Sequence, residues 1–343
     1  MMIINDIKLD YNDVLIVPKR STLSSRSEVD ITRHFVFKHS QNIWSGVPII
    51  GANMTSIASF QMAHELNKNN MMLALHKYFK FNELSEFFAN QTNFEYNWYT
   101  TGISEDEIKK FAELYTANSN INKLCVDVAN GYQEQFITTI KKLRDQFPNV
   151  TIMAGNVVTP EITEELILSG ADIVKIGIGS GVFCETRIKT GVGYPQLSAT
   201  IECADAAHGL NGLICSDGGC NNPGDIAKSF AGGADFVMIG GMLSGHDESD
   251  GKIVTKDGKK YIESYGMSSE TAMNLFNNGM PEYRTSEGRT VLVECKGPVA
   301  KTIQDILGGL RSTLTYTGSK SLKNLSKRST FVRVNQQYND KFE

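Results

Sequence analysis

The residue best suited to chemistry is Cys184, which lies in a glycine-rich loop and outside any strand or helix pattern. The loop reads Gly177-Ile-Gly-Ser-Gly-Val-Phe-Cys-Glu-Thr-Arg187, so its backbone can fold tightly and expose carbonyls and amides. Most cysteines are small buried hydrophobes, and three that lie within strand or helix patterns fit that description: Cys125, Cys203 and Cys215. Cys184 does not fit it, and a nearby Arg187 would favour the thiolate. We therefore predict that Cys184 is a nucleophile.

Two more glycine-rich loops follow apolar runs, at Ser216-Asp-Gly-Gly-Cys220 and Gly240-Gly-Met242. These runs are the seventh and eighth of the eight apolar runs described below. In α/β barrels, the loops after the seventh and eighth strands often bind a phosphate. The alternative is that the glycines only form tight turns with positive φ. We predict that the loops hold a phosphate and that Asp217 accepts hydrogen bonds from ribose hydroxyls. The spacing of Gly177, Gly179 and Gly181 does not match a dinucleotide fingerprint, so we do not predict a Rossmann fold.

The elements that must position these loops are short apolar runs that alternate with helix-length segments. The runs are apolar nearly throughout, as expected for strands covered on both faces, and span 47–53, 71–76, 97–102, 123–128, 150–155, 173–177, 213–217 and 236–240. The helical segments include 56–69, 131–147, 160–169, 196–208 and 299–313. Eight such units predict a single α/β domain over 1–343, a closed (β/α)₈ TIM barrel. An open doubly wound sheet is the alternative, because the run at 97–102 is short and polar.

Two segments break the alternation. Residues 241–298 are far longer than an ordinary loop, and we predict a mobile flap there with a polar hairpin at 245–260. The second is the tail after Thr317. Its simplest interpretation is a solvent-exposed basic face that carries Lys320, Lys323, Lys327 and Arg328.

The composition excludes several classes of protein. The formal net charge is −4 and no long basic run occurs, so we expect no nucleic-acid partner. No apolar stretch has the length of a membrane span, and the first residues lack the apolar core of a signal peptide, so we expect no membrane association. The six scattered cysteines show no C-x-x-C pair, which favours reduced thiols in the cytoplasm.

Several motifs resemble the IMP dehydrogenase/GMP reductase superfamily over nearly the whole chain. They are Gly155-Asn-Val-Val158, Lys189-Thr-Gly-Val-Gly-Tyr-Pro-Gln196, Ser216-Asp-Gly-Gly-Cys220, Tyr265-Gly-Met-Ser-Ser269, Arg284-Thr-Ser-Glu-Gly288 and Asp305-Ile-Leu-Gly-Gly-Leu-Arg-Ser312. The segment Glu202-Cys-Ala-Asp-Ala-Ala-His208 and the tail are similar to the reductase branch. IMP dehydrogenases usually carry a CBS-domain pair after the second barrel helix, and none is inserted here. The resemblance implies NADPH-dependent conversion of GMP to IMP and ammonia.

The resemblance also implies roles for individual residues. The catalytic set would be the nucleophile Cys184, with Thr186 and Glu287 handling the proton of the departing amine. Residues matching the GMP or IMP site are Asp217, Gly218, Gly219, Gly240, Gly241, Gly266, Met267, Ser268, Arg284, Ser286 and Gly288. Residues matching NADPH contacts are Ser25, Arg26, Lys77, Asp127, Val128, Ala129, Ile178, Gly179, Tyr283, Arg284, Ser312, Thr313, Leu314 and Thr315. Carbonyls of Gly179, Gly181 and Cys184 match a potassium site, and family members are typically homotetramers.

The chain departs from the family pattern at three positions. Val182 replaces a serine that normally helps to hold the phosphate, Glu185 adds a carboxylate beside the nucleophile, and Thr55 stands where Asp is usual. Two other functions therefore stay open: oxidation of IMP as in IMP dehydrogenases, and an inactive nucleotide-binding barrel. The intact Cys184, Thr186 and Glu287 favour the reductase.

Overall fold

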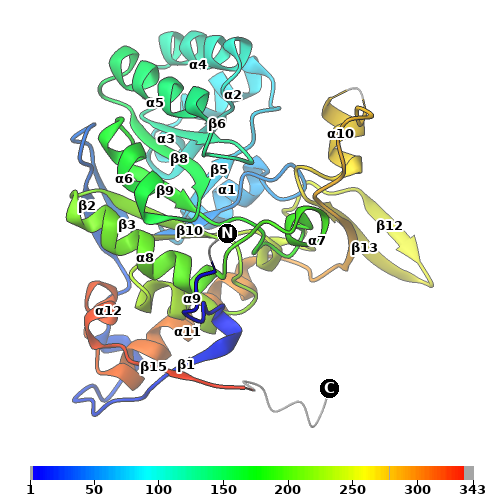
Figure 1. Cartoon of the computed structure of the whole chain (residues 1–343). Coiled ribbons are helices and arrows are strands. Elements are labelled where there is room, and N and C mark those ends of the chain that lie inside the picture. Colours follow the sequence, from blue (N-terminus) through cyan, green and yellow to red (C-terminus); the bar gives the residue numbers. More distant parts are fainter. Residues whose placement is uncertain (1–2, 278, 336–343) are drawn as a thin grey trace.

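The computed structural model describes residues 3–277 and 279–335. Within them, eight parallel strands close a barrel, one at each predicted run, which excludes the open sheet (Figure 1). The polar third run forms a strand as well. In sequence order the barrel strands are β4 (Ile49–Gly51), β5 (Met72–Leu75), β6 (Asn97–Thr101), β7 (Lys123–Asp127), β8 (Thr151–Val157), β9 (Ile173–Ile176), β10 (Leu213–Asp217) and β11 (Phe236–Ile239).

Side chains of the barrel strands alternate between two hydrophobic clusters. On β9, Ile173 points into the barrel, whereas Val174 and Ile176 pack outward against the helices. The same period of two separates Cys125 and Cys215, inside the barrel, from their outward neighbours. Both faces are buried, which is why the strands read as apolar runs.

Helices surround the barrel, and polar residues fix where several of them start. Ser104 caps α4 in a capping box with Glu107, and Asn222 caps α9 just before Pro223. Thr159 occupies the cap position of α6 just before Pro160, although its side chain makes no capping bond. The helices around the barrel are α1 (Phe60–Asn67), α2 (Phe81–Phe88), α3 (Gln91–Tyr96), α4 (Glu105–Ala117), α5 (Glu134–Gln146), α6 (Pro160–Leu168), α7 (Thr186–Thr190), α8 (Gln196–Gly209), α9 (Pro223–Ala231) and α11 (Ala300–Thr317).

An antiparallel hairpin of β2 (Arg33–Val36) and β3 (Ile43–Gly46), which the sequence analysis did not predict, packs on the barrel interior. The rings of Phe35 and Trp44 lie 4.7 Å and 5.6 Å from that of Phe236, centre to centre. Burial of large aromatic side chains, each contributing roughly 1.5–3 kcal/mol, stabilises the packing of this hairpin on the barrel.

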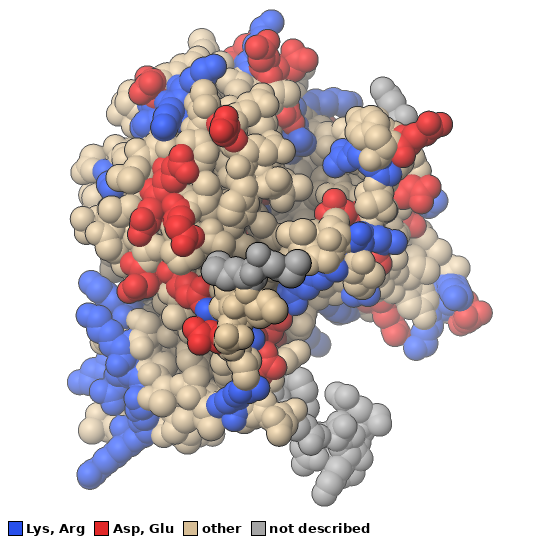
Figure 2. All heavy atoms as spheres, in the orientation of Figure 1, with Lys and Arg blue, Asp and Glu red and all other residues tan. Residues whose placement is uncertain are grey.

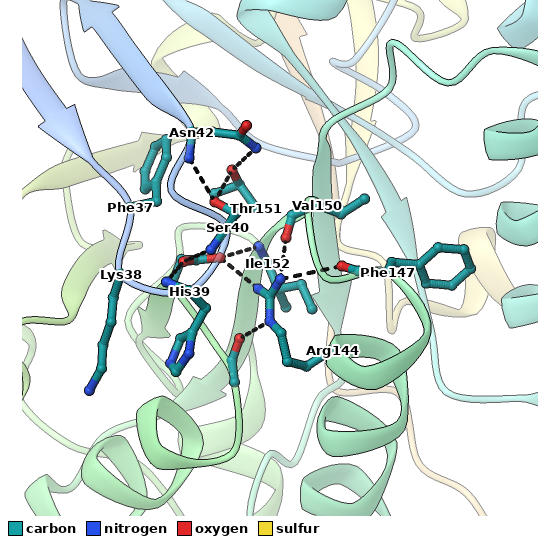
Figure 3. A network of polar contacts seen from close by, with 12 residues as sticks. Phe37, Lys38, His39, Ser40, Asn42, Arg144, Phe147, Val150, Thr151 and Ile152 are labelled. Carbon is teal, nitrogen blue, oxygen red and sulfur yellow. Dashed lines mark hydrogen bonds and ion pairs between the residues drawn. The ribbon is translucent and has the colours of Figure 1, made fainter.

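One buried carboxylate ties the hairpin turn to the barrel. Asp172, fully buried at the start of β9, accepts hydrogen bonds from the backbone amides of His39, Ser40 and Ile152. Arg144 of α5 donates to the same carboxylate at 2.7 Å and also reaches carbonyls that follow its helix, as Figure 3 shows. The Asp172 carboxylate thus accepts hydrogen bonds from the hairpin turn, from β8 and from α5, and so links the three.

The long segment after β11 is structured, and its hairpin lies later than predicted. After η3 (Gly241–Leu243), β12 (Ile253–Lys256) and β13 (Lys259–Tyr265) form the hairpin, which turns at Asp257 and Gly258 with positive φ at both residues. β13 also pairs with β14 (Thr290–Glu294), and α10 (Glu270–Phe276) lies between them in sequence. The prediction of a hairpin over 245–260 was wrong in position because β13 takes its register from two partners.

The tail packs back on the start of the chain. After η4 (Leu322–Asn324) and α12 (Leu325–Arg328), β15 (Phe331–Arg333) pairs with β1 (Val14–Ile16), which follows η1 (Tyr11–Asp13). The tail's basic side chains are exposed, and Figure 2 shows Lys and Arg gathered along the lower left edge of the view. Among the described helices, none has the length and apolar character needed to cross a membrane.

Candidate active site

The carboxyl ends of the barrel strands surround a cavity of about 590 Å³. This volume suits small-molecule binding. The cavity brings together most of the predicted site residues, from loops far apart in sequence. Those that line it are Lys77, Asp127, Val128, Ala129, Ile178, Gly179, Gly181, Cys184, Thr186, Asp217, Gly218, Gly219, Gly240, Gly241, Gly266, Met267, Ser268, Arg284, Glu287 and Gly288.

Cys184, Thr186 and Glu287 form a continuous hydrogen-bonded chain. The Cys184 thiol donates to the Thr186 hydroxyl with an Sγ to Oγ1 distance of 3.2 Å, and that hydroxyl donates to Glu287 Oε2 at 2.8 Å. A thiol, a hydroxyl and a carboxylate in series can move a proton away from the sulfur or toward a group bound beside it.

Backbone pairing brings this chain of side chains together. The amide of Glu185 donates to the carbonyl of Glu287 at 2.7 Å, and the amide of Arg289 donates to the carbonyl of Phe183 at 3.0 Å. Gly266 lies against the same segment, where a Cβ would approach the Phe183 carbonyl oxygen to 2.9 Å. The loop of Cys184, which leads into α7, thus lies beside the segment that leads from β13 to β14 (Figure 1).

The charged group of Arg187 is bonded to two residues other than Cys184. Its guanidinium donates to the Asp10 carboxylate at 3.0 Å and to the carbonyl of Tyr194 at 2.6 Å. The charge of Arg187 is therefore engaged by Asp10, and the side chain fixes the loop by lying over Gly179 and Gly193. The contacts of the guanidinium are thus with Asp10 and Tyr194, and an effect of Arg187 on Cys184 stays a prediction.

The two pairs of glycines after β10 and β11 differ in what they require. Gly218 and Gly219 have φ of +95° and +81°, a conformation that other residues rarely adopt. Gly240 and Gly241 have no such angle, and only Gly240 has a crowded surrounding, since a Cβ on Gly241 would make ordinary contact with Val182 at 3.4 Å. A Cβ on Gly240 would lie 3.1 Å from the sulfur of Met54. Both pairs line the cavity, so backbone is exposed there.

The three departures from the family pattern differ in position. Val182 lines the cavity, and its side chain lies 3.4 Å from where a Cβ of Gly241 would be. Thr55 is buried and donates to the hydroxyl of Tyr265 at 3.2 Å, which links the end of β4 to the 265–268 loop. Glu185 is the N-cap residue of α7 and is not among the residues that line the cavity.

A buried charge network crosses the floor of the cavity. The ammonium of Lys175 lies 2.6 Å from Asp217 Oδ2 and 2.8 Å from Asp127 Oδ1. Burial lowers the pKa of Lys175, but the two carboxylates outweigh it and hold that pKa well above its usual value. Asn156 donates to Asp217 at 2.9 Å, and Asn53 donates to Asp127 at 3.0 Å.

Lys77 and His76 lie at another part of the cavity, after β5. Lys77 pairs with Glu107, the same carboxylate that caps α4, and this pairing raises the pKa of Lys77 despite the burial that opposes it. His76 stacks on Phe79 with ring centres 3.9 Å apart. Burial, together with nearby Lys110, lowers the pKa of His76 to about 4, so its imidazole is neutral at pH 7.

Some predicted site residues do not line this cavity. Tyr283 is 88% exposed, and Ser286 donates to the carbonyl of Gly288 beside the cavity. A second group lies elsewhere on the molecule, where η2 (Arg26–Glu28) packs against α11. It comprises Ser25, Arg26, Ser312, Thr313, Leu314 and Thr315.

Sequence reasoning missed several polar residues that line the cavity, among them Asn53, His76, Glu107, Asn156 and Lys175. Lys175 had a usable signal, because a charged residue inside an apolar strand requires a partner in the fold. Asn53 lies two residues after β4 and His76 directly follows β5, the usual place of functional side chains in a barrel.

Comparisons with known proteins agree with this geometry. A model of the IMP dehydrogenase / GMP reductase domain matches residues 8–339. The chain belongs to the IMP dehydrogenase/GMP reductase family. The chain is 54% identical to a GMP reductase of Shewanella pealeana over 99% of both chains. It is 55% identical to one of Escherichia coli over 99% of this chain and 98% of the other.

A solved structure has the same fold as this family member. A GMP reductase variant from Trypanosoma brucei, in complex with guanosine 5′-monophosphate, superposes with a TM-score of 0.86. The match covers 96% of each chain at 24% identity. At this identity the likeness establishes the TIM-barrel fold.

Proposed function

We infer that this chain is a GMP reductase, which converts GMP to IMP and ammonia with NADPH as reductant. The observation that carries the inference is the chain of hydrogen bonds from Cys184 through Thr186 to Glu287, at the mouth of a cavity lined by glycine-rich loops. The full-length relatives at 54% and 55% identity support the same activity. The net reaction consumes GMP, NADPH and two protons, and yields IMP, NADP⁺ and ammonium.

Cys184 acts as the nucleophile at C2 of the purine. Its thiolate forms a C–S bond to C2, and the C–N bond to the exocyclic amine breaks. Thr186 and Glu287 pass a proton to the departing nitrogen, which leaves as ammonia. The nucleotide is then held as a thioimidate on Cys184. When bound, NADPH supplies the hydride that replaces the amine at C2, and the C–S bond breaks to return the Cys184 thiolate.

We propose that the GMP site is formed by loops on the Cys184 side of the cavity. Asp217 accepts hydrogen bonds from the ribose, and Gly218, Gly219, Gly240 and Gly241 offer backbone to the phosphate. The remaining contacts to the base and ribose phosphate come from Gly266, Met267, Ser268, Arg284, Ser286 and Gly288. Asn156 supports a polar ligand here, because its Oδ1 is buried without a hydrogen-bond partner among the described residues.

The residues around Lys77 fit NADPH. One cavity contains Cys184, Lys77 and Asp127. Its lining also includes Val128, Ala129, Ile178 and Gly179. We propose that these residues hold the nicotinamide half, with Arg284 and the exposed Tyr283 covering it.

We further propose a potassium ion beside the nucleophile. Gly181 and Cys184 are the ends of one tight turn, in which the Cys184 amide donates to the Gly181 carbonyl at 3.0 Å, and Gly179 lies two residues before it. Carbonyl oxygens are suitable ligands for such a hard cation. Its role would be to order the loop of Cys184.

We propose that the protein is a homotetramer of single-domain chains, 1–343, in which residues 241–298 act as a flap over the nucleotide. The group formed by Ser25, Arg26 and residues 312–315 would then complete the NADPH site of a neighbouring subunit.

The six cysteines are all free, which suits a protein of the reducing cytoplasm.

Steady-state assays test the function. GMP with NADPH should give IMP and ammonium, whereas IMP with NAD⁺ should give no sustained turnover. Sustained turnover of IMP with NAD⁺ would assign the chain to IMP oxidation, and GMP binding without turnover in either direction would assign it to the inactive nucleotide-binding barrels.

A further inference from the structure

Lys175 is a buried charge at the floor of the cavity that the proposed chemistry does not use. Its side chain is 4% exposed and points into the barrel, whereas its neighbours Val174 and Ile176 pack outward. The ammonium contacts two carboxylates at 2.8 Å and 2.6 Å, those of Asp127 and Asp217. These two lie among the predicted residues for the cofactor and for the nucleotide, respectively.

The strand register explains how one lysine reaches both carboxylates. Asp217 ends β10, a direct neighbour of β9, whereas Asp127 ends β7 and is separated from β9 by β8. On β8 the residue in register with both Asp127 and Lys175 is Gly155. A Cβ there would lie 2.7 Å from the Cβ of Lys175. Gly155 thus leaves the space through which the ammonium crosses β8 to Asp127.

The local charges make the lysine indispensable to this arrangement. The other titratable groups near the ammonium are the thiols of Cys125 and Cys215, and burial raises the pKa of both well above the usual value, so both stay neutral. Lys175 is thus the cation that contacts both carboxylates, whereas Lys77, which pairs with Glu107, attracts only Asp127 and more weakly. Asn156 and Lys175 both donate to Oδ2 of Asp217, and among the described residues no donor contacts Oδ1. Oδ1 is the atom left to a ligand.

We propose that Lys175 is a positioning residue that holds the nucleotide-side carboxylate Asp217 and the cofactor-side carboxylate Asp127 in place together, so that both ligand sites depend on one buried cation. The proposal rests on the proposed function, because it takes Asp217 and Asp127 as ligand contacts. Lys175 also lines the cavity, but the role proposed for it acts through the two carboxylates. Without it, these partly buried carboxylates would lose the cation that they share and would move apart or take up a proton.

The proposal predicts that removal of the Lys175 charge lowers the affinity for both ligands and leaves the contacts of the nucleophile unchanged. In Lys175→Met, binding of GMP alone and of NADPH alone should each weaken at least about tenfold, since breaking a buried ion pair on one side is costly. The KM for each ligand should rise more than kcat falls, because Cys184, Thr186 and Glu287 keep their own contacts. Lys175→Arg, which keeps the cation, should recover much of both affinities.

Lys123→Met is the matched control. Lys123 is also 4% exposed in a barrel strand, but its ammonium donates to the carbonyl of Phe94 and to the side chain of Asn122, and it does not line the cavity. A role in folding alone would make the two methionine variants alike in thermal stability and in ligand affinity. Our proposal requires that only Lys175→Met loses affinity for both ligands.

Isothermal titration calorimetry of the purified proteins, with GMP alone and with NADPH alone, decides between these outcomes. Weakening of GMP binding only, or of NADPH binding only, would overturn the proposal that one cation serves both sites, as would unchanged affinity for both. Calorimetry does not require turnover, so wild-type protein that binds both ligands without producing IMP would contradict the proposed function and leave this test intact.

Discussion

The sulfur of Cys184 is the only thiol among six that combines partial exposure, a place in the cavity wall and a hydroxyl partner. Cys125, Cys203, Cys215 and Cys220 are buried, and Cys295 is not among the residues that line the cavity. Single residues at the site can therefore be tested against chemically identical residues elsewhere in the same chain.

Cys184→Ala should abolish turnover and leave GMP binding nearly unchanged, because the thiolate acts in bond formation and contributes little to ground-state affinity. Removal of a nucleophile typically costs many orders of magnitude in kcat. Cys203→Ala, a change in a buried thiol of α8, serves as the control and should keep its kcat. A Cys184→Ala protein with more than about a tenth of wild-type turnover would refute the assignment of the nucleophile.

Val182 tests how the phosphate is held. Its side chain is 38% exposed and lines the cavity opposite Gly241, where a serine would offer a hydrogen bond to an anion of roughly 1.5–3 kcal/mol. Val182→Ser should lower the KM for GMP by about tenfold and change kcat little, because the phosphate lies far from C2 and its binding is uniform along the reaction.

The alternative is that Val182 and Phe183 repack the loop together and the phosphate lies elsewhere. Both residues line the cavity, but Phe183 is buried and packs in the outer core, with its carbonyl accepting from the Arg289 amide, whereas Val182 is exposed. Steady-state kinetics with Val192→Ser as an exposed control distinguish the two. An unchanged or higher KM in Val182→Ser alone would favour joint repacking.

At the scale of elements, the β2–β3 hairpin shows how a feature remote from the cavity can hold the barrel. Its aromatic side chains complete the inner cluster, and the Asp172 carboxylate accepts from the amides of His39 and Ser40 in the turn. An amide at this position would place an NH₂ group against the N–H donors that now meet carboxylate oxygens.

Asp172→Asn should therefore reduce the free energy of unfolding by about 3–5 kcal/mol, the range seen when a buried pair loses one partner. Urea denaturation measures it, and Asp205→Asn, an exposed change on α8, is the control. Equal denaturation midpoints for the two variants would show that the carboxylate does not anchor the hairpin.

At the scale of the whole molecule, the predicted NADPH contacts fall into two groups. One lines the cavity and the other lies where η2 packs against α11, while Tyr283 is exposed and belongs to neither. A homotetramer in which one subunit's second group completes its neighbour's cavity would reconcile the two.

Co-expression of two defective chains tests this assembly. Arg26→Ala and Cys184→Ala should each have low activity as pure proteins at limiting NADPH. In mixed tetramers about a quarter of the sites should combine an intact Cys184 with an intact Arg26 from the neighbour, since each is present with a probability of about one half. Activity no higher than the average of the parents would indicate that each chain forms its site alone or that Arg26 is not needed.

The sequence by itself determined the eight strands, because barrel strands are buried on both faces and, except for the polar β6, read as apolar runs. It also located the glycine-rich loop of Cys184, whereas positive φ, the alternative offered for both glycine pairs, holds for Gly218 and Gly219 alone. The hairpin near 245–260 was misplaced and β2–β3 was missed, since both depend on partners distant in sequence.

Only the tertiary structure decided which charges meet. Arg187 is three residues from Cys184, yet it pairs with Asp10, 177 residues away in the chain. Lys175 lies between carboxylates from two other strands, and Glu287 reaches Thr186 across 101 residues. Propensity and periodicity act over a few residues, whereas the pairing of charges depends on distances set by barrel closure and strand register.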